Sequence, residues 1–212
     1  LTYLVHRQRD RVGFVAFDDD VVEHVPPSAK HMETILHVLD RLKPTKPGSF
    51  AEPMKKLAEH YGRKGMLVLV SDFYEDPQAI VEAVADEAAE FGFPLVVDPV
   101  MISKHGLPLV AGDAKSAMVA RLIPLAFLLT PNVPEASALT GIEIGGCGDM
   151  RHAARLLAAM GARAVLIKGG HAQSAQAVDL LVTPAAAARF SAQKIDTQNT
   201  HGTGCTLSAA IA

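Results

Sequence analysis

Residues whose types could support phosphate or metal chemistry gather in four short segments between positions 98 and 205. They are Asp98, the pair Asn132 and Glu135, the run Lys168-Gly169-Gly170, and the run from Gly202 to Cys205. Carboxylate and amide oxygens suit a divalent cation, whereas a lysine and glycine-flanked backbone amides suit an anion. Together, the four segments could supply both halves of a site for a metal-bound phosphate.

The run from Gly202 to Cys205 places two glycines directly before a predicted helix. Glycine lets the backbone approach an anion closely, and the free amides at a helix start point towards it. Such a nest stabilises the negative charge of a phosphoryl group in transfer. Cys205 would lie in the first turn, where the helix dipole favours a thiolate. The alternative is a plain glycine turn followed by a small buried cysteine.

The other three segments also carry alternatives. Asn132 and Glu135, three residues apart at a helix start, could hold hydrated Mg²⁺ or could form an ordinary capping box. Lys168 could reach nucleotide phosphates or could be a surface lysine before a turn. Asp98, before Pro99, could be a metal or acceptor-side carboxylate or could simply cap the end of a strand.

These segments need strands and helices that bring them together. Strands and helices are predicted to alternate through residues 95–212, which favours an α/β fold with a mostly parallel sheet flanked by helices. In such a sheet, ligands bind at the carboxyl ends of the strands, where all four segments are predicted to fall. The predicted strands are 95–97, 127–129, 164–167, 178–183 and 190–194, and the helices 113–122, 135–140, 149–160 and a last one opening at Gly202.

The first part of the chain also predicts mixed secondary structure. Strands over 11–17 and 21–25 flank an aspartate turn, and helices follow over 29–42 and 50–61. A further strand is predicted over 66–70 and a helix over 77–91. The apolar face expected for the first helix consists of Met32, Ile35, Leu36, Leu39 and Leu42.

Composition bounds the protein class. The chain has 212 residues, 49% of them hydrophobic, with a net charge of −3 and 5% aromatics, which argues against a nucleic-acid partner. No apolar run is long enough for a membrane span, and two cysteines favour a reducing, cytoplasmic location. Charged residues fill 27 of the first 90 positions and 16 of the remaining 122, so the two parts look like different proteins.

Residues from about 80 to 212 closely resemble the hydroxymethylpyrimidine/phosphomethylpyrimidine kinases of thiamine biosynthesis, in the ribokinase superfamily. The resemblance implies ATP- and Mg²⁺-dependent phosphorylation of the pyrimidine hydroxymethyl group and then of its monophosphate. The matching segments are Pro94–Met101, Leu129–Ala136, Leu166–His171 and Asp196–Ser208.

The resemblance also implies roles for single residues. Cys205 takes the place of the superfamily's catalytic aspartate as the base for the acceptor hydroxyl. Gly202, Thr203 and Gly204 form the anion hole, and Thr203 is also expected to contact ATP, as are Lys168 and Gly170. Asn132 and Glu135 organise Mg²⁺, with Asp98 near the phosphates and the metal. The partners implied are small molecules: ATP and hydroxymethylpyrimidine or its phosphate.

The chain departs from this family at both ends. The glycine-rich strand–turn with which these kinases begin has no match here, and they continue for tens of residues beyond the start of the last helix. The acceptor pocket is therefore expected to be largely absent, and catalytic activity could be lost.

The first part resembles a bacterial von Willebrand A-like domain of the group found beside MoxR-type ATPases. Segments 8–18 and 68–73 carry this resemblance, and Ser49 and Asp72 match two of the cation ligands of such domains. The expected division is a partial von Willebrand A-like segment over 1–82 and a partial ribokinase-like segment over 83–212. The competing hypotheses to a kinase are a cation-dependent interaction module and an inactive chimera, and a homo-oligomer is left open.

Overall fold

The computed structural model describes residue 7 and residues 10–43, 48–60, 76–88, 94–101, 112–170, 176–194 and 203–211. The chain divides into two compact units, Leu1–Arg63 and Lys64–Ala212, here called the N-terminal unit and the C-terminal unit. The predicted strand over 66–70 and Asp72 lie outside the described residues.

The N-terminal unit contains the predicted hairpin. Strands β1 (Val12–Phe17) and β2 (Val21–Ser28) pair antiparallel around the aspartate turn. β2 continues through Pro26 and Pro27, where the sequence predicted its end. The two prolines fall where the register shifts between Val12 and Phe14, and a bulge in a two-stranded sheet tolerates residues that cannot donate a ladder hydrogen bond.

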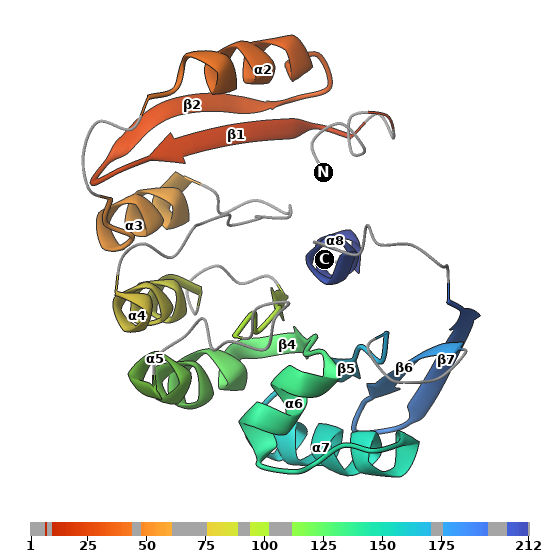
Figure 1. The fold of residues 1–212 in the computed structure, drawn as a ribbon. Coiled ribbons are helices and arrows are strands. Elements are labelled where there is room, and N and C mark those ends of the chain that lie inside the picture. Colours follow the sequence, from red (N-terminus) through yellow and green to blue (C-terminus); the bar gives the residue numbers. More distant parts are fainter. Residues whose placement is uncertain are drawn as a thin grey trace. The chain divides into compact units, whose positions relative to one another are not determined.

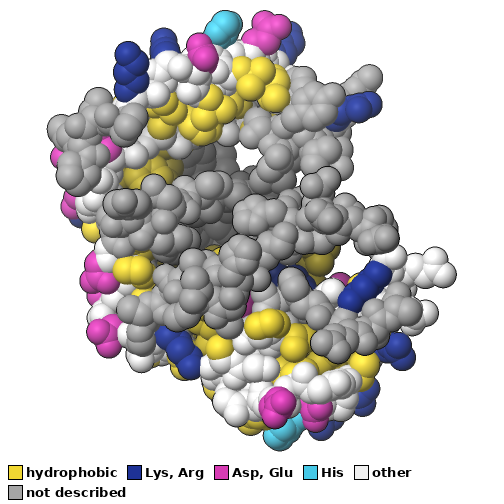
Figure 2. Space-filling view, viewed as in Figure 1, with side chains coloured by type: hydrophobic (Ala, Val, Ile, Leu, Met, Phe, Trp, Pro, Cys, Tyr) yellow, Lys and Arg dark blue, Asp and Glu magenta, His cyan; other side chains and the backbone are white. Residues whose placement is uncertain are grey.

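Helix α2 (Met32–Arg41) covers the hairpin with a narrower apolar face than the sequence predicted. Ile35 and Val38 are buried together with Val25 of β2, whereas Leu36 and Leu39 are 52% and 48% exposed. The helical spacing of these leucines predicted the helix correctly, but neither leucine belongs to its buried face. Figure 2 shows charged side chains of both signs over α2, with hydrophobic side chains over the hairpin below it. Helix α3 (Ala51–His60) completes the described part of this unit.

The C-terminal unit is built on a five-stranded sheet in the order β3-β4-β5-β6-β7 (Figure 1). The pairs β3–β4 and β4–β5 are parallel, and the pairs β5–β6 and β6–β7 are antiparallel. The α/β class is confirmed, but the sheet is mixed rather than mostly parallel, because the last two strands form a hairpin. The strands are β3 (Leu95–Val97), β4 (Ala126–Leu129), β5 (Val165–Ile167), β6 (Gln176–Val182) and β7 (Ala187–Gln193).

Helices flank this sheet. Helix α7 packs on β5 and β6, α6 packs on α7, α4 contacts α5, and α8 contacts β3. The core includes Ile123, Leu129, Leu157 and Ile167, all fully buried. The helices are α4 (Pro77–Ala88), α5 (Gly112–Ala117), α6 (Val133–Thr140), α7 (Cys147–Ala159) and α8 (Thr203–Ile211), and α5 continues into a π-helical turn (Met118–Leu122) and a 3₁₀ turn (Ile123–Leu125).

The three parallel strands end at one edge of the sheet, and each is followed by a polar residue: Asp98 after β3, Thr130 after β4 and Lys168 after β5. The edge is held together by backbone bonds, since the Thr130 amide donates to Val97 and the Lys168 amide donates to Pro131. The fold therefore places side chains that are 70 residues apart in sequence at one place. No helix in the described ranges has the length and apolar character needed to cross a membrane.

The turn between α7 and β5 gives a stability prediction. Gly161 has φ +120°, and a Cβ there would lie 2.7 Å from the backbone Cα of Pro124. We expect Gly161→Ala to lower the free energy of unfolding by about 2–3 kcal/mol, because strain at positive φ adds to the clash. Urea denaturation followed by circular dichroism measures this change.

Gly141 provides the matched control, because it also has a positive φ (+74°) but has open space around its Cβ position. Gly141→Ala should lower the free energy of unfolding by about 1 kcal/mol, because only backbone strain is introduced. Equal losses in the two variants would show that contact with Pro124 plays no part.

Candidate active site

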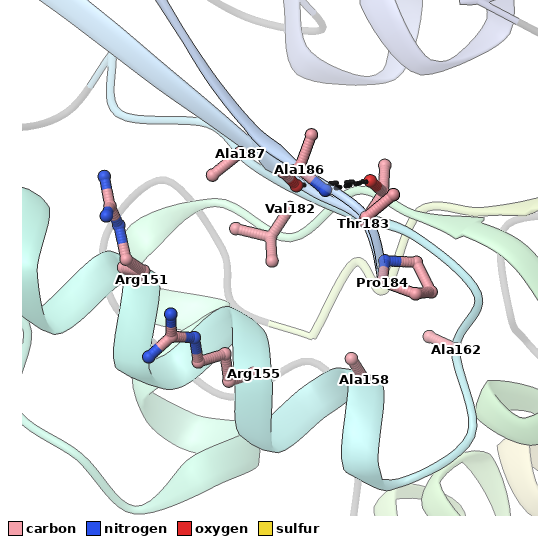
Figure 3. A pocket seen from close by; sticks show the side chains of 10 residues that line it. Arg151, Arg155, Ala158, Ala162, Val182, Thr183, Pro184, Ala186 and Ala187 are labelled. Carbon is pink, nitrogen blue, oxygen red and sulfur yellow. Dashed lines mark hydrogen bonds between the residues drawn. The ribbon is translucent and has the colours of Figure 1, made fainter.

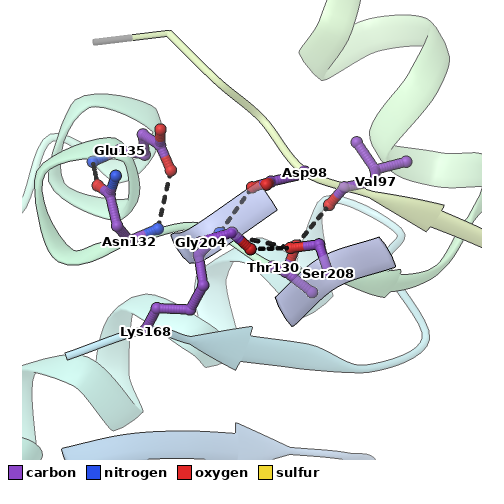
Figure 4. Close-up of polar contacts among 8 residues, drawn as sticks. All are labelled: Val97, Asp98, Thr130, Asn132, Glu135, Lys168, Gly204 and Ser208. Carbon is purple, nitrogen blue, oxygen red and sulfur yellow. Dashed lines mark hydrogen bonds and ion pairs between the residues drawn. The ribbon is translucent and has the colours of Figure 1, made fainter. Parts of the chain in front are cut away.

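An ion pair joins the ends of β3 and β5. The Lys168 ammonium donates to Asp98 Oδ1 over 2.8 Å, and the side chains of the two residues are only 10% and 16% exposed (Figure 4). The second oxygen of Asp98, Oδ2, is buried and has no hydrogen-bond partner within the described part of the chain. Both charged groups are therefore largely shielded from water at the ends of β3 and β5.

Two buried hydroxyl groups lie beside this ion pair. Ser208 Oγ of α8 is 2.8 Å from Thr130 Oγ1, and Lys168 Nζ is 3.5 Å from Ser208 Oγ. Thr130 is fully buried and Ser208 is 5% exposed. These hydroxyls connect the last described helix to the edge of the sheet.

Asn132 and Glu135 form a capping box, which was one of the two predictions made from their spacing. Asn132 Oδ1 accepts from the Glu135 amide over 2.9 Å, and Glu135 Oε2 accepts from the Asn132 amide over 2.8 Å. Each side chain oxygen thereby satisfies a free amide at the start of α6. Glu135 also accepts a hydrogen bond from the Met101 backbone.

Glu135 is nevertheless an unusual capping residue, because it is 3% exposed. Burial raises the pKa of the Glu135 carboxyl, and the negative charge of Asp98 raises it further. The hydrogen bond from Asn132 and the charge of Lys168 act in the opposite direction. Two carboxylates therefore share the field of one ammonium group.

The turn after β5 is fixed by close packing against β6. The Gly169 amide donates to Asp179 Oδ1 over 2.8 Å, and a Cβ on Gly169 would lie 1.9 Å from the carbonyl oxygen of Val178. Only glycine fits there. Gly170, the next residue, is exposed, with no neighbouring atom near its Cβ position.

The first turn of α8 faces the ion pair. A Cβ built on Gly204 would lie 3.2 Å from Lys168 Nζ. The helix begins at Thr203 and contains Cys205, so both residues lie in the first turn as predicted. Gly202 and the side chains of Thr203 and Cys205 lie outside the described parts of the structure.

The structure thus brings Asp98, Lys168 and Gly204 together, with the Asn132–Glu135 box at the start of the neighbouring helix. The sequence analysis missed Thr130, Asp179 and Ser208. Thr130 and Ser208 lie inside two of the motif segments, and this position was the only sequence evidence for a role in the site. Their hydrogen bond to each other depends on how α8 packs against the sheet.

The residues predicted to hold a cation fit such a group. In the described ranges no three His, Cys, Asp or Glu side chains gather into a metal site. The predicted set has only two carboxylates and one amide, which suits Mg²⁺ because this ion keeps several of its waters. The unpartnered Oδ2 of Asp98 and the raised pKa of Glu135 are the observations that favour a positive group between them.

A separate pocket of about 520 Å³ lies between α7 and the β6–β7 turn (Figure 3). Arg151 and Arg155 line one wall, and Val182 and the turn residues line the rest. Val182 pairs with Val165, the first residue of β5, whereas Lys168 follows the last. The pocket therefore lies at the opposite end of the sheet from the polar cluster.

The buried carboxyl of Glu135 gives a pH prediction. Its raised pKa means that the folded chain binds this proton more tightly than the unfolded chain, whose reference value is 4.5. The free energy of unfolding should therefore fall as pH rises from about 4.5 through the raised pKa. Glu135→Gln stays neutral and can still accept from Asn132, so this component of the pH dependence should disappear.

Urea denaturation of both proteins from about pH 4 to about pH 8, without divalent cations, measures the difference. Glu143→Gln is the control, because Glu143 is exposed in the loop after α6 and lies outside the capping box. A difference between the wild-type chain and Glu135→Gln that stays constant across this range would contradict the prediction.

Comparisons with known proteins indicate the family to which the chain belongs. Residues 76–212 match the phosphomethylpyrimidine kinase family, and residues 1–90 match a family described as a protein of unknown function, DUF58. The predicted boundary at 82/83 falls within the overlap of these two matches and stays a prediction.

Among curated relatives, the hydroxymethylpyrimidine/phosphomethylpyrimidine kinase of Rhizobium meliloti is 45% identical over 133 residues, covering 62% of this chain and 50% of the relative. The Escherichia coli kinase of the same name is 46% identical over 135 residues, with 63% and 51% covered. The chain therefore spans about half the length of these relatives.

Solved structures show the same relationship. Phosphomethylpyrimidine kinase from Clostridium difficile is 34% identical with a TM-score of 0.58, covering 74% of this chain and 64% of that one. The ADP complex of Bacillus subtilis pyridoxal kinase is 36% identical with a TM-score of 0.57, and 69% and 52% are covered. The family match covers well over half of the chain, from the start of α4 to the last residue, and the chain belongs to the phosphomethylpyrimidine kinase family.

Proposed function

We propose that this chain supplies the ATP-handling part of a kinase that phosphorylates hydroxymethylpyrimidine and then its monophosphate in thiamine biosynthesis. The observation that carries the proposal is the meeting of Lys168, Asp98 and the first turn of α8 at the carboxyl ends of three parallel strands. Ligands of open α/β sheets bind at this edge. The family match adds the reaction class.

The first turn of α8 and Lys168 would bind the phosphates. The amides of a helix start point at an anion and the helix dipole favours negative charge there. The ammonium of Lys168 lies beside Gly204 and adds a full positive charge at the same place. A side chain at position 204 would enter this space, which explains a glycine there. Thr203 and Gly170 are the other residues proposed to contact ATP.

Cys205 is proposed as the base that takes the proton of the acceptor hydroxyl. Its backbone belongs to the first turn of α8, and a thiol at the start of a helix is favoured as the thiolate by the helix dipole. Gly202, Thr203 and Gly204 would stabilise the charge on the transferring phosphoryl group.

Asp98, Asn132 and Glu135 would hold Mg²⁺, which when bound supplies positive charge to the phosphate oxygens. The Oδ2 atom of Asp98, which has no hydrogen-bond partner among the described residues, supports this assignment. The capping box fixes the orientation of Asn132 and Glu135 before any ligand arrives.

The acceptor is proposed from the relatives, of which the aligned part of this chain covers 50% and 51%. Pyridoxal is the second candidate acceptor, since a pyridoxal kinase from Bacillus subtilis is 36% identical over the aligned region. Assays with both acceptors, run with the same ATP concentration, separate the two.

Lys168 gives a binding prediction. Lys168→Met keeps the length of the side chain but removes the charge, so the dissociation constant for ADP with Mg²⁺ should rise about tenfold or more. Isothermal titration calorimetry on the 212-residue chain measures it. Lys194→Met removes an exposed lysine beyond β7 and is the control. Unchanged affinity in a folded Lys168→Met variant would remove Lys168 from the site.

Cys205 gives a catalytic prediction. Loss of a general base costs about 10²–10⁴ in rate, so Cys205→Ser should reduce ATP-dependent phosphorylation of hydroxymethylpyrimidine by that factor. Cys205→Asp, which restores a base at the same position, should recover part of the rate. Coupled measurement of ADP release, with and without acceptor, gives both values. Equal turnover in the wild type and Cys205→Ser would exclude the thiol as base.

A further inference from the structure

Two hydroxyl groups that no motif assigns to the reaction connect α8 to the polar edge of the sheet. Ser208 Oγ lies within hydrogen-bond distance of three groups: Thr130 Oγ1 at 2.8 Å, the Gly204 carbonyl at 3.0 Å and Lys168 Nζ at 3.5 Å. Thr130 Oγ1 is in turn 3.3 Å from the Val97 carbonyl. Figure 4 shows Ser208 and Thr130 pointing toward each other.

The donors and acceptors can be assigned from chemistry. A hydroxyl donates one hydrogen and accepts two, whereas an ammonium only donates. Ser208 can donate to Gly204 and accept from Thr130, or it can donate to Thr130 while Thr130 donates to Val97. In both arrangements Ser208 Oγ is the acceptor for Lys168 Nζ. The direction of the lysine contact therefore does not depend on the rotation of either hydroxyl.

This acceptor fixes the second side of the Lys168 ammonium. Asp98 Oδ1 holds one side over 2.8 Å, and Ser208 holds the other from the helix whose first turn contains Gly204. Thr130, fully buried at the end of β4, keeps Ser208 in place. With Asp98 alone, the long lysine chain could turn away from α8 while keeping its ion pair.

We propose that Ser208, held by Thr130, is a positioning residue that keeps the Lys168 ammonium against the first turn of α8. The consequence for phosphate binding rests on the proposed kinase function. The geometric part, the restraint on Lys168, does not rest on it.

The test uses the 212-residue chain with Ser208→Ala and compares two readouts. The first is the acetylation rate of Lys168 by acetic anhydride, measured by mass spectrometry, with Lys115 and Lys194 as references in the same molecule. The second is the dissociation constant for ADP with Mg²⁺. Ser208→Ala should raise both about tenfold, because a hydrogen bond to a charged group is lost. Ser137→Ala, the same change on α6, should alter neither.

Thr130→Val keeps the shape of its buried side chain and is the second variant. Thr130→Val should raise the acetylation rate of Lys168 by a smaller factor than Ser208→Ala. In the double variant, the increase in this rate should be smaller than the product of the two single increases, because the residues share one network. If Ser208→Ala does not fold, Thr130→Val decides the question alone.

An unchanged Lys168 rate in a folded variant, with only a lower melting temperature, overturns the proposal and makes the hydroxyls purely structural. A raised Lys168 rate together with no ADP binding by the wild-type chain supports the restraint on Lys168 and removes the proposed function. A raised rate together with weaker ADP binding supports both.

Discussion

The ion pair between Asp98 and Lys168 is the interaction on which the polar edge of the sheet depends. It joins the ends of two strands that are separated by β4, and both partners are largely shielded from water. Removing one partner of a buried pair typically costs about 3–5 kcal/mol, since the other charge is left without compensation. Gly204 and the hydroxyl of Ser208 lie beside the Lys168 ammonium, and the two charges of the pair act in opposite directions on the pKa of Glu135, which burial raises.

Much of this edge could be predicted from the sequence, because parallel strands bring their carboxyl ends together. The predicted strand over 95–97 is the observed β3, and the residues after β3 and β5 were correctly expected at one site. The mixed character of the sheet was not predicted, because the alternation of strands and helices along the sequence does not show in which direction β6 pairs with β5. Thr130 and Ser208 were missed because a hydroxyl in a motif looks the same whether it is exposed or buried under a docked helix.

The uneven charge along the chain has a structural counterpart. The described core of the N-terminal unit centres on Val25, Ile35 and Val38, and most of the positions around it are exposed. In the C-terminal unit, β5 is buried along its whole length and packs against α7, whereas β7 is exposed. Strands buried on both faces read as continuous apolar runs. The two family matches, which meet near α4, agree with this contrast between the units.

The contact between Gly169 and the Val178 carbonyl has a consequence for comparing relatives. Any other residue at position 169 would force the backbone of β6 away from the turn that carries Lys168, and the amide bond to Asp179 would be lost with it. A glycine at position 169 therefore indicates that β6 lies close to the turn after β5. A homologous sequence with a larger residue at this place encodes a displaced hairpin, even where every other motif is unchanged.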